Sequence, residues 1–272
     1  RRDWLLGGKD ILEFADWQDY FALQRRADGK WSFREWLPGA TGALLVGEFS
    51  GWQDSPEYAL HPIGDDIWEG IFPDTTLYHG QQYRLKVFWP GGDGWRIPSS
   101  AVRTVRQSGL TGETVFNAQV WAPEAYRWQH PRPSADKAPL IYEAHVGMAQ
   151  QQEKIGTFQE FAEKVLPRVA ETGYNTLQLM AIAQHPYYAS FGYQVANFFA
   201  VCDLYGTPED FKALVDRAHG MGLRVIMDLV HSHSVRNALE GLGELSGCRH
   251  PFFHAGVRGE HPAWGTYCFD YG

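Results

Sequence analysis

The chain has 272 residues, of which 44% are hydrophobic and 21% charged, so it can build one large domain or two ordinary ones. Its formal net charge is −8, and no segment is rich in lysine or arginine. This argues against nucleic acid and anionic membrane surfaces as partners, because both attract clustered positive charge. No apolar run approaches the roughly 20 residues that cross a bilayer. A neutral ligand fits this composition better.

The three cysteines are too few and too scattered for a disulfide framework or a CxxC metal site. An odd number of cysteines fits a reducing compartment, and we expect a cytoplasmic protein. The sequence starts at Arg1 with neither an initiator methionine nor a secretory segment, so we expect a piece of a longer protein. Aromatic residues reach 15%, with 11 tryptophans, which suits either aromatic-rich cores or stacking on sugar rings.

The first half of the chain has the pattern of an antiparallel β domain. Residues 1–28 form an N-terminal segment in which Ile11 to Leu23 could be a helix. Over residues 29–120, short runs rich in β-formers alternate with Pro- and Gly-containing turns, which predicts a small antiparallel sandwich. The expected strands are 31–37, 43–49, 67–72 and 83–88.

A proline-containing linker over residues 121–139 precedes a change of period. Residues 140–272 then begin strand, helix, strand, helix, strand, and the near-continuous apolar strands imply parallel pairing. The expected strands are 140–146, 176–182 and 224–230. Thr157 and Thr207 are predicted N-caps of the two helices, and Pro167 should kink or break the first. Residues 231–272 show no clear period.

Polar residues collect where these strands end, the edge at which parallel barrels carry their function. His145 follows the first strand, and Asp228 closes the third with His233 five positions later. A carboxylate and an imidazole at one rim could hydrogen-bond vicinal sugar hydroxyls. Asp228 could equally satisfy loop amides or an ion pair.

The two histidines of His231-Ser232-His233 could bind a metal or simply pack, although no neighbouring ligands complete a zinc site. A catalytic triad using Ser232 lacks the nucleophile-elbow context. The loop after the second strand carries four aromatic residues between 187 and 193. Tyr193, between Gly192 and Gln194, could lay its ring under a sugar, whereas core packing is the simpler role for the other three.

The chain resembles the glycogen and starch branching enzymes of glycoside hydrolase family 13, nearest to the eukaryotic-like type. Any one matching segment alone is weak, but all occur in the family's order. The matching segments are Phe33-Arg34-Glu35-Trp36-Leu37-Pro38-Gly39-Ala40, Val46-Gly47-Glu48-Phe49-Ser50-Gly51-Trp52, Ile141-Tyr142-Glu143-Ala144-His145-Val146-Gly147, Tyr187 to Gln194, Tyr205-Gly206-Thr207-Pro208-Glu209, Ala218-His219 and Asp228 to His233.

The resemblance implies a multidomain β plus α/β fold: a carbohydrate-binding β-sandwich of the glycogen-binding type, then the first three β/α units of a TIM (β/α)8 barrel. It implies an α-glucan partner such as glycogen, starch or a maltooligosaccharide. Tyr193 would stack on the glucosyl unit at the cleavage point, and Asp228 and His233 would hold that unit. Trp36 and Pro38 match a surface glucan contact, although Trp36 could equally belong to the sandwich core.

Members of this family cut an α-1,4 bond, and the branching enzymes transfer the segment to form an α-1,6 branch. This chemistry with retention needs two carboxyl groups roughly 5 Å apart. The resemblance places them on later barrel strands, beyond Gly272, so no catalytic residue is assigned and the fragment alone is expected to be inactive. The rest of its own barrel is then an expected partner.

In the wider family an asparagine before the histidine helps hold calcium. Ser232 stands there, so neither a metal site nor a cofactor is expected. Two alternatives remain open. One is a debranching-type relative with the same front part, and the other is a non-catalytic α-glucan-binding protein.

Overall fold

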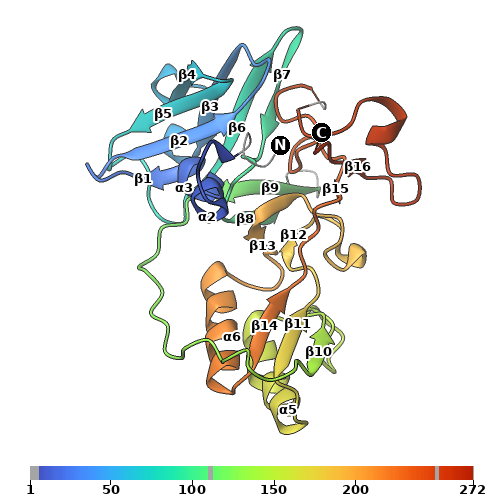
Figure 1. Cartoon of the computed structure of the whole chain (residues 1–272). Helices are drawn as coiled ribbons and strands as arrows, with labels where there is room; N and C mark the ends of the chain where they lie inside the picture. The colour runs from blue at the N-terminus through green and yellow to red at the C-terminus, as the bar shows by residue number, and fades with distance from the viewer. Residues whose placement is uncertain (1–5, 110–112, 249–250, 272) are drawn as a thin grey trace.

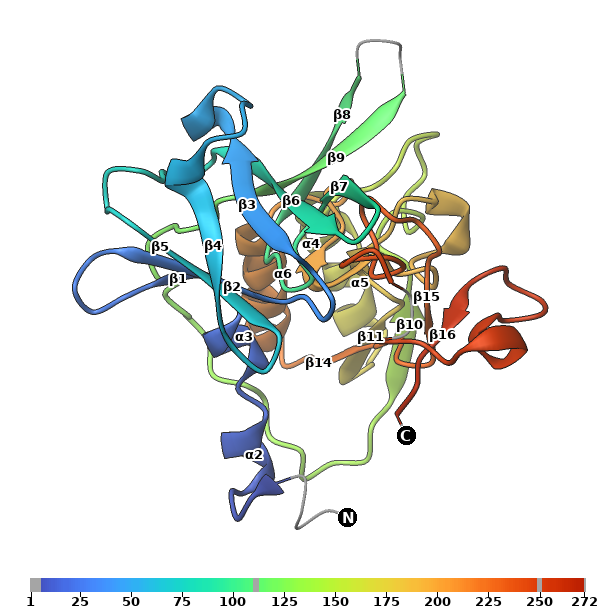
Figure 2. The ribbon, with the colours of Figure 1, turned by 90° about the horizontal axis from the view of Figure 1, so that it is seen from above.

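The computed structural model describes residues 6–109, 113–248 and 251–271. A β-sheet domain lies above an α/β part, and a long linker joins the two along one side (Figure 1). Seen from above, this linker follows the outside of the molecule on its way to strand β10, Ile141–Ala144 (Figure 2). No helix among the described residues is long and apolar enough to cross a membrane.

The N-terminal segment differs from the single helix that the sequence suggested. Within residues 6–28 it forms two four-residue helices, α2 (Ile11–Phe14) and α3 (Trp17–Tyr20), and strand β1 (Ala22–Arg25). The Asp10 carboxylate caps α2 by accepting from the amides of Leu12 and Glu13. β1 pairs antiparallel with the next strand, so the sheet begins before residue 29.

The antiparallel β domain expected in the first half of the chain is present. In the described residues it has nine strands, in the order β1-β2-β5-β4-β3-β6-β9-β8, with β7 paired to β6. The 3-10 turns η1 (Glu48–Ser50) and η2 (Pro56–Tyr58) follow β3. The strands are β2 (Trp31–Trp36), β3 (Gly42–Gly47), β4 (Ala59–Gly64), β5 (Ile67–Phe72), β6 (Gln82–Trp89), β7 (Gly92–Arg96), β8 (Thr104–Ser108) and β9 (Thr114–Gln119).

β4 pairs with both β3 and β5, which allows the sheet to fold over on itself and enclose a core. Side chains from the two halves meet inside it, with Phe33 and Phe72 from one half and Leu45, Leu85 and Phe116 from the other. Burial of these large apolar side chains is the main stabilising contribution to this domain.

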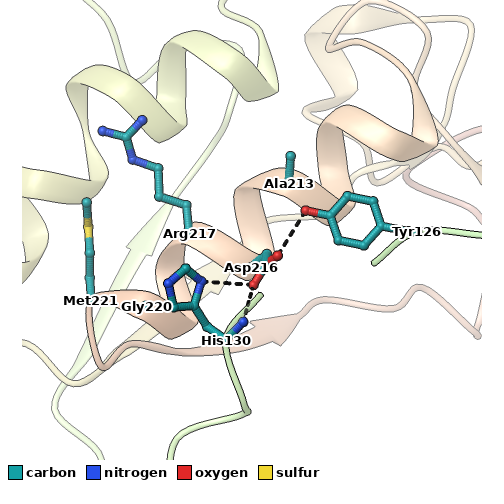
Figure 3. Close-up of a pocket in the computed structure, with 7 residues that line it drawn as sticks. All are labelled: Tyr126, His130, Ala213, Asp216, Arg217, Gly220 and Met221. Carbon is teal, nitrogen blue, oxygen red and sulfur yellow. Dashed lines mark hydrogen bonds and ion pairs between the residues drawn. The ribbon is translucent and has the colours of Figure 1, made fainter. Parts of the chain in front are cut away.

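The linker contains no helix or strand between β9 and β10 and is held by the helix it crosses. Asp216 of α6 (Pro208–Gly220) accepts hydrogen bonds from the His130 amide, the His130 ring and the Tyr126 hydroxyl (Figure 3). It also accepts from the Gln129 amide. Burial opposes ionisation of Asp216, but these hydrogen bonds outweigh it and lower its pKa. The adjoining cavity of about 350 Å³ therefore marks where the linker attaches.

The α/β part has the expected parallel strands. Among the described residues β10, β11 (Thr176–Leu179) and β14 (Arg224–Met227) form one parallel sheet in the order β10-β11-β14. The first helical segment is divided into α4 (Phe158–Lys164) and α5 (Leu166–Glu171), and the break falls at Val165, two residues before Pro167. Thr157 and Thr207 form capping boxes with Glu160 and Asp210.

Short elements build the loops at the carboxyl ends of these strands. They are β12 (Ala183–Gln184), η3 (Tyr188–Ser190), β13 (Asn197–Val201), β15 (His233–Ser234), η4 (Gly256–Gly259) and β16 (Tyr267–Cys268). β15 and β16 pair antiparallel, so the segment from residue 251 onward returns to the loop that follows β14. The sequence showed no period here because the segment is held by these few strand contacts and by aromatic packing.

Candidate functional site

Asp228 stands one residue beyond β14, at the rim of the parallel sheet. Its amide donates to the carbonyl of Leu179, which fixes it beside the end of β11. One carboxylate oxygen accepts from the Tyr193 hydroxyl at 2.7 Å, and the other accepts from Gln178 Nε2 at 2.9 Å. The side chain is half-buried and reaches the rim, where a ligand could meet it.

The loop that carries Tyr193 is shaped by its neighbours. Phe191 and Gly192 both have positive φ, at 55° and 90°, and the Tyr193 amide donates to the Ser190 carbonyl. A Cβ atom at Gly192 would collide with the carbonyl oxygen of Ala181, so only glycine fits this close approach. This loop conformation places the Tyr193 hydroxyl within hydrogen-bond distance of Asp228.

Burial, followed by the hydrogen bond to Asp228, raises the pKa of Tyr193 to about 12. The phenol therefore stays neutral at physiological pH and keeps its proton for donation. A neutral ring with a fixed hydroxyl suits contact with an uncharged ligand.

His233 reaches the same place from β15, where it pairs with Cys268 of β16. It is 4% exposed, and its Nδ1 is buried without a hydrogen-bond partner among the described residues. Burial lowers its pKa, and the nearby charge of His261 lowers it further, so the ring is neutral at pH 7. A neutral imidazole carries one donor and one acceptor nitrogen.

A cavity of about 260 Å³ joins these parts. Tyr193 and His233 line it together with Ser190, Gln194 and Trp264. Two of the three residues predicted to hold a sugar thus face one cavity, and the third, Asp228, is hydrogen-bonded to Tyr193. His231 is exposed and contributes its backbone carbonyl to the Tyr271 hydroxyl. The part of the chain that the structure describes contains no cluster of three or more histidine, cysteine or acidic residues suited to a metal.

Sequence reasoning missed Gln178 and Glu143. Gln178 bridges two carboxylates, because its Nε2 donates to Glu143 at 3.1 Å as well as to Asp228. Glu143 and Gln178 are register partners on β10 and β11, so both point to the same side of the sheet. For Gln178 the available signal was its polar side chain within the mostly apolar run 176–182.

The β domain supports the Tyr193 loop from outside the α/β part. Arg106 of β8 forms an ion pair with Asp203 at 2.8 Å, and its backbone amide donates to the same carboxylate. The guanidinium also donates to the carbonyl of His185, at the start of the loop, and Gln184 donates to Asp203. These contacts couple the two parts of the molecule at the start of the Tyr193 loop.

His145, the other strand-end histidine, is a packing residue. It is buried, its Nε2 lies 3.1 Å from the Tyr205 hydroxyl, and its ring meets Tyr188 and Phe191 edge-on. Burial, with a smaller contribution from His185, lowers its pKa. It packs directly against the aromatic residues that precede Tyr193.

Trp36 and Pro38 lie where the β domain meets the C-terminal segment. Trp36 is half-buried and its ring packs edge-on against Phe252, with 5.4 Å between centroids. The Pro38 carbonyl accepts from the Ser246 hydroxyl at 2.8 Å. Of the two roles considered for Trp36, this packing favours a structural one.

Two family models match this chain, one in each part. The carbohydrate-binding module 48 family, described as the isoamylase N-terminal domain, matches residues 21–102, and the α-amylase catalytic-domain family matches residues 141–239. The 1,4-α-glucan-branching enzyme of Yarrowia lipolytica is 39% identical over 96% of this chain and 39% of its own length. The chain is homologous to the branching enzymes.

A plant branching enzyme shows the same relationship. The 1,4-α-glucan-branching enzyme 2-2 (chloroplastic/amyloplastic) of Arabidopsis thaliana is 41% identical, and the match covers 91% of this chain and 31% of that protein. The chain therefore spans between three and four tenths of the length of these two branching enzymes. The homology confirms the family expected from the motifs, with a carbohydrate-binding module followed by part of an α-amylase-type catalytic domain.

Solved structures share the fold at lower identity. A putative α-amylase from Salmonella typhimurium superposes with a TM-score of 0.70 at 24% identity, covering 92% of this chain and 38% of that one. The catalytic module of the glycogen-degrading pneumococcal virulence factor SpuA gives a TM-score of 0.72 at 18% identity, covering 92% and 42%. Both solved chains are longer than this one and contain its arrangement of a β domain and an α/β part.

Proposed function

We propose that this chain is the glucan-holding part of a 1,4-α-glucan branching enzyme, which cuts an α-1,4 chain and re-attaches the segment as an α-1,6 branch. The observation that carries the proposal is the Tyr193–Asp228 hydrogen bond beside a cavity that His233 lines. It occurs in a chain 39–41% identical to proteins named as branching enzymes.

The three side chains suit one neutral glucosyl unit. The Tyr193 ring offers a flat apolar face for the C–H groups of a pyranose, while Asp228 accepts from its hydroxyls. Each carboxylate oxygen of Asp228 has a second lone pair, so the bonds from Tyr193 and Gln178 leave room for sugar hydroxyls. Neutral His233 can donate to or accept from a further hydroxyl. Binding of the neutral sugar depends on hydrogen bonds and stacking, so its affinity should change little with salt concentration.

The acids that break the bond are proposed to come from the remaining barrel strands. Retention needs a nucleophile and a general acid about 5 to 5.5 Å apart. In this chain Glu143 and Asp228 are two carboxylates at the rim, but both accept a hydrogen bond from the Gln178 amide, which lies between them. We assign neither role to any residue of this chain, and the proposed task of residues 1–272 is to bind and orient.

A debranching relative or a non-catalytic binder would share the fold. Identity favours branching, because branching enzymes match at 39–41% and the α-amylase and SpuA structures at 18–24%. We do not extend the proposal to a glucan site at Trp36 and Pro38, because the C-terminal segment packs on both.

The test is a calorimetric titration of residues 1–272 with maltoheptaose and with cellohexaose, which has the same sugar in β-1,4 linkage. Maltoheptaose should bind and cellohexaose should not. Equal affinity for both would contradict an α-glucan site. In an iodine-staining assay on amylose the chain alone should leave the colour unchanged, and a branching signal would contradict the assignment of the acids to later strands.

A further inference from the structure

We propose that the exposed face of Trp264 is a second sugar-binding surface, which takes the glucosyl unit next to the one held by Tyr193. The ligand class is an α-1,4-linked oligosaccharide. The inference rests on the proposed function and adds a residue that no motif singled out.

Trp264 is exposed where a large apolar ring is costly. It is 54% exposed although it lines the same 260 Å³ cavity as Tyr193 and His233. Ligand pockets are lined mainly by apolar and aromatic side chains with a few polar groups, and Trp264, Tyr193 and His233 give this cavity such a lining.

The ring is held in place before any ligand arrives. His261 stacks flat on Trp264, with 3.9 Å between centroids and 2° between planes, and His233 packs against it at 4.9 Å. His261 Nδ1 accepts from the Ala263 and Trp264 amides, and its own amide donates to the Thr266 carbonyl. One face of the indole is therefore covered by His261, and the ring pays little ordering cost when it binds.

The turn that carries Trp264 is tied to the Tyr193 loop. Gln194 Nε2 donates to the Trp264 carbonyl at 3.3 Å, and the turn leads directly into β16, which pairs with His233. The rings of Tyr193, His233 and Trp264 are therefore carried by segments that are bonded to one another. A volume of 260 Å³ is slightly below the roughly 300 Å³ at which small-molecule sites begin, so a longer chain must extend past the cavity mouth. Trp264, an exposed aromatic residue of the cavity lining, offers a surface for that extension.

The test compares maltoheptaose affinity for wild type, Trp264→Ala, Trp264→Phe and Tyr193→Ala, with Trp128→Ala as control. Trp128 is a tryptophan of equal exposure, 53%, that lines a different groove. Trp264→Ala should weaken binding about tenfold, Trp264→Phe should retain most of it, and Trp128→Ala should have no effect. The thermal midpoint of each variant shows whether a loss reflects unfolding.

The outcomes separate this inference from the proposed function. If wild type binds and Tyr193→Ala weakens binding while folded Trp264→Ala matches wild type, Trp264 is no sugar-binding surface and the proposed function stands. If wild type does not bind, or Tyr193→Ala binds as well as wild type, the proposed function itself fails. Loss in both folded alanine variants, with recovery in Trp264→Phe, supports both.

Discussion

The hydroxyl of Tyr193 donates to the carboxylate of Asp228 across 2.7 Å, joining a loop residue to a strand-end residue 35 positions later. Gln178 holds the other oxygen, so the carboxylate cannot rotate freely. A binding group fixed in this way loses little entropy when a ligand arrives. The hydrogen bond makes Tyr193 a support for Asp228, and in the proposed site its ring is also the surface on which a sugar stacks.

Removing only the Tyr193 hydroxyl should weaken glucan binding less than removing the whole ring. Tyr193→Phe keeps the flat face but releases Asp228, so maltoheptaose affinity should fall about three- to tenfold, whereas Tyr193→Ala should lose more. Asp228→Asn should weaken binding by about tenfold or more, because an amide donates where the carboxylate accepts. Calorimetric titration measures all three. A Tyr193→Phe variant weaker than Tyr193→Ala would show that the ring does not stack.

Gly192 should tolerate no side chain. Gly192→Ala places a Cβ against the Ala181 carbonyl and displaces the Tyr193 loop, so glucan affinity should be lost. Gly256→Ala is the matched control, because Gly256 also has positive φ but its Cβ would meet nothing within 4 Å. The control should cost only the left-handed strain of about 1 kcal/mol and leave affinity intact. Undiminished binding by Gly192→Ala would mean that the loop conformation is not what places Tyr193.

The ion pair between the two parts of the molecule should matter for stability. Arg106→Met leaves the Asp203 carboxylate buried without its main partner, and unfolding should become easier by about 3 kcal/mol. Arg236→Met breaks an exposed pair with Glu260 and should cost less than about 1 kcal/mol. Chemical denaturation of both variants gives the comparison. Similar small losses in the two would show that Arg106 is not a structural tie.

The raised pKa of Glu35 predicts that the stability of the β domain depends on pH. It is buried on β2, and its carboxyl accepts from the Ser99 amide and hydroxyl and from the Trp36 amide. Burial raises its pKa from 4.5 to about 7 despite these hydrogen bonds. The folded state therefore holds a proton that the unfolded state releases.

The contribution of protonated Glu35 to the free energy of unfolding is fully present below pH 4.5 and is lost as the pH rises through about 7. The loss is on the order of 3 kcal/mol. Glu35→Gln cannot titrate, so its stability should change less between pH 5 and pH 8 than that of wild type. Denaturation midpoints at the two pH values test this. A constant difference between wild type and variant would show that Glu35 does not titrate in this range.

Much of the fold could be predicted because local signals were strong. The capping boxes at Thr157 and Thr207, the break near Pro167 and the apolar strand runs all depend on neighbouring residues in the sequence. The N-terminal segment was harder, since Ala22 and Leu23 fit a helix and become a strand only because β2 is there to pair with them.

The site could be predicted only in part. Asp228 could be predicted because it follows an apolar strand, and Tyr193 because it follows a glycine in an aromatic-rich loop. Trp264 and Gln178 depend on contacts that no period reveals, because Trp264 is positioned by the pairing of β15 with β16. Trp36 matched a motif, and only the structure shows Phe252 packed against it.

A crystal structure of residues 1–272 with maltoheptaose would test the sugar-binding site most directly. We predict a glucosyl ring against the Tyr193 side chain, with hydroxyls within hydrogen-bond distance of Asp228 and His233. A maltoheptaose molecule bound elsewhere on the chain, with this cavity empty, would contradict the account.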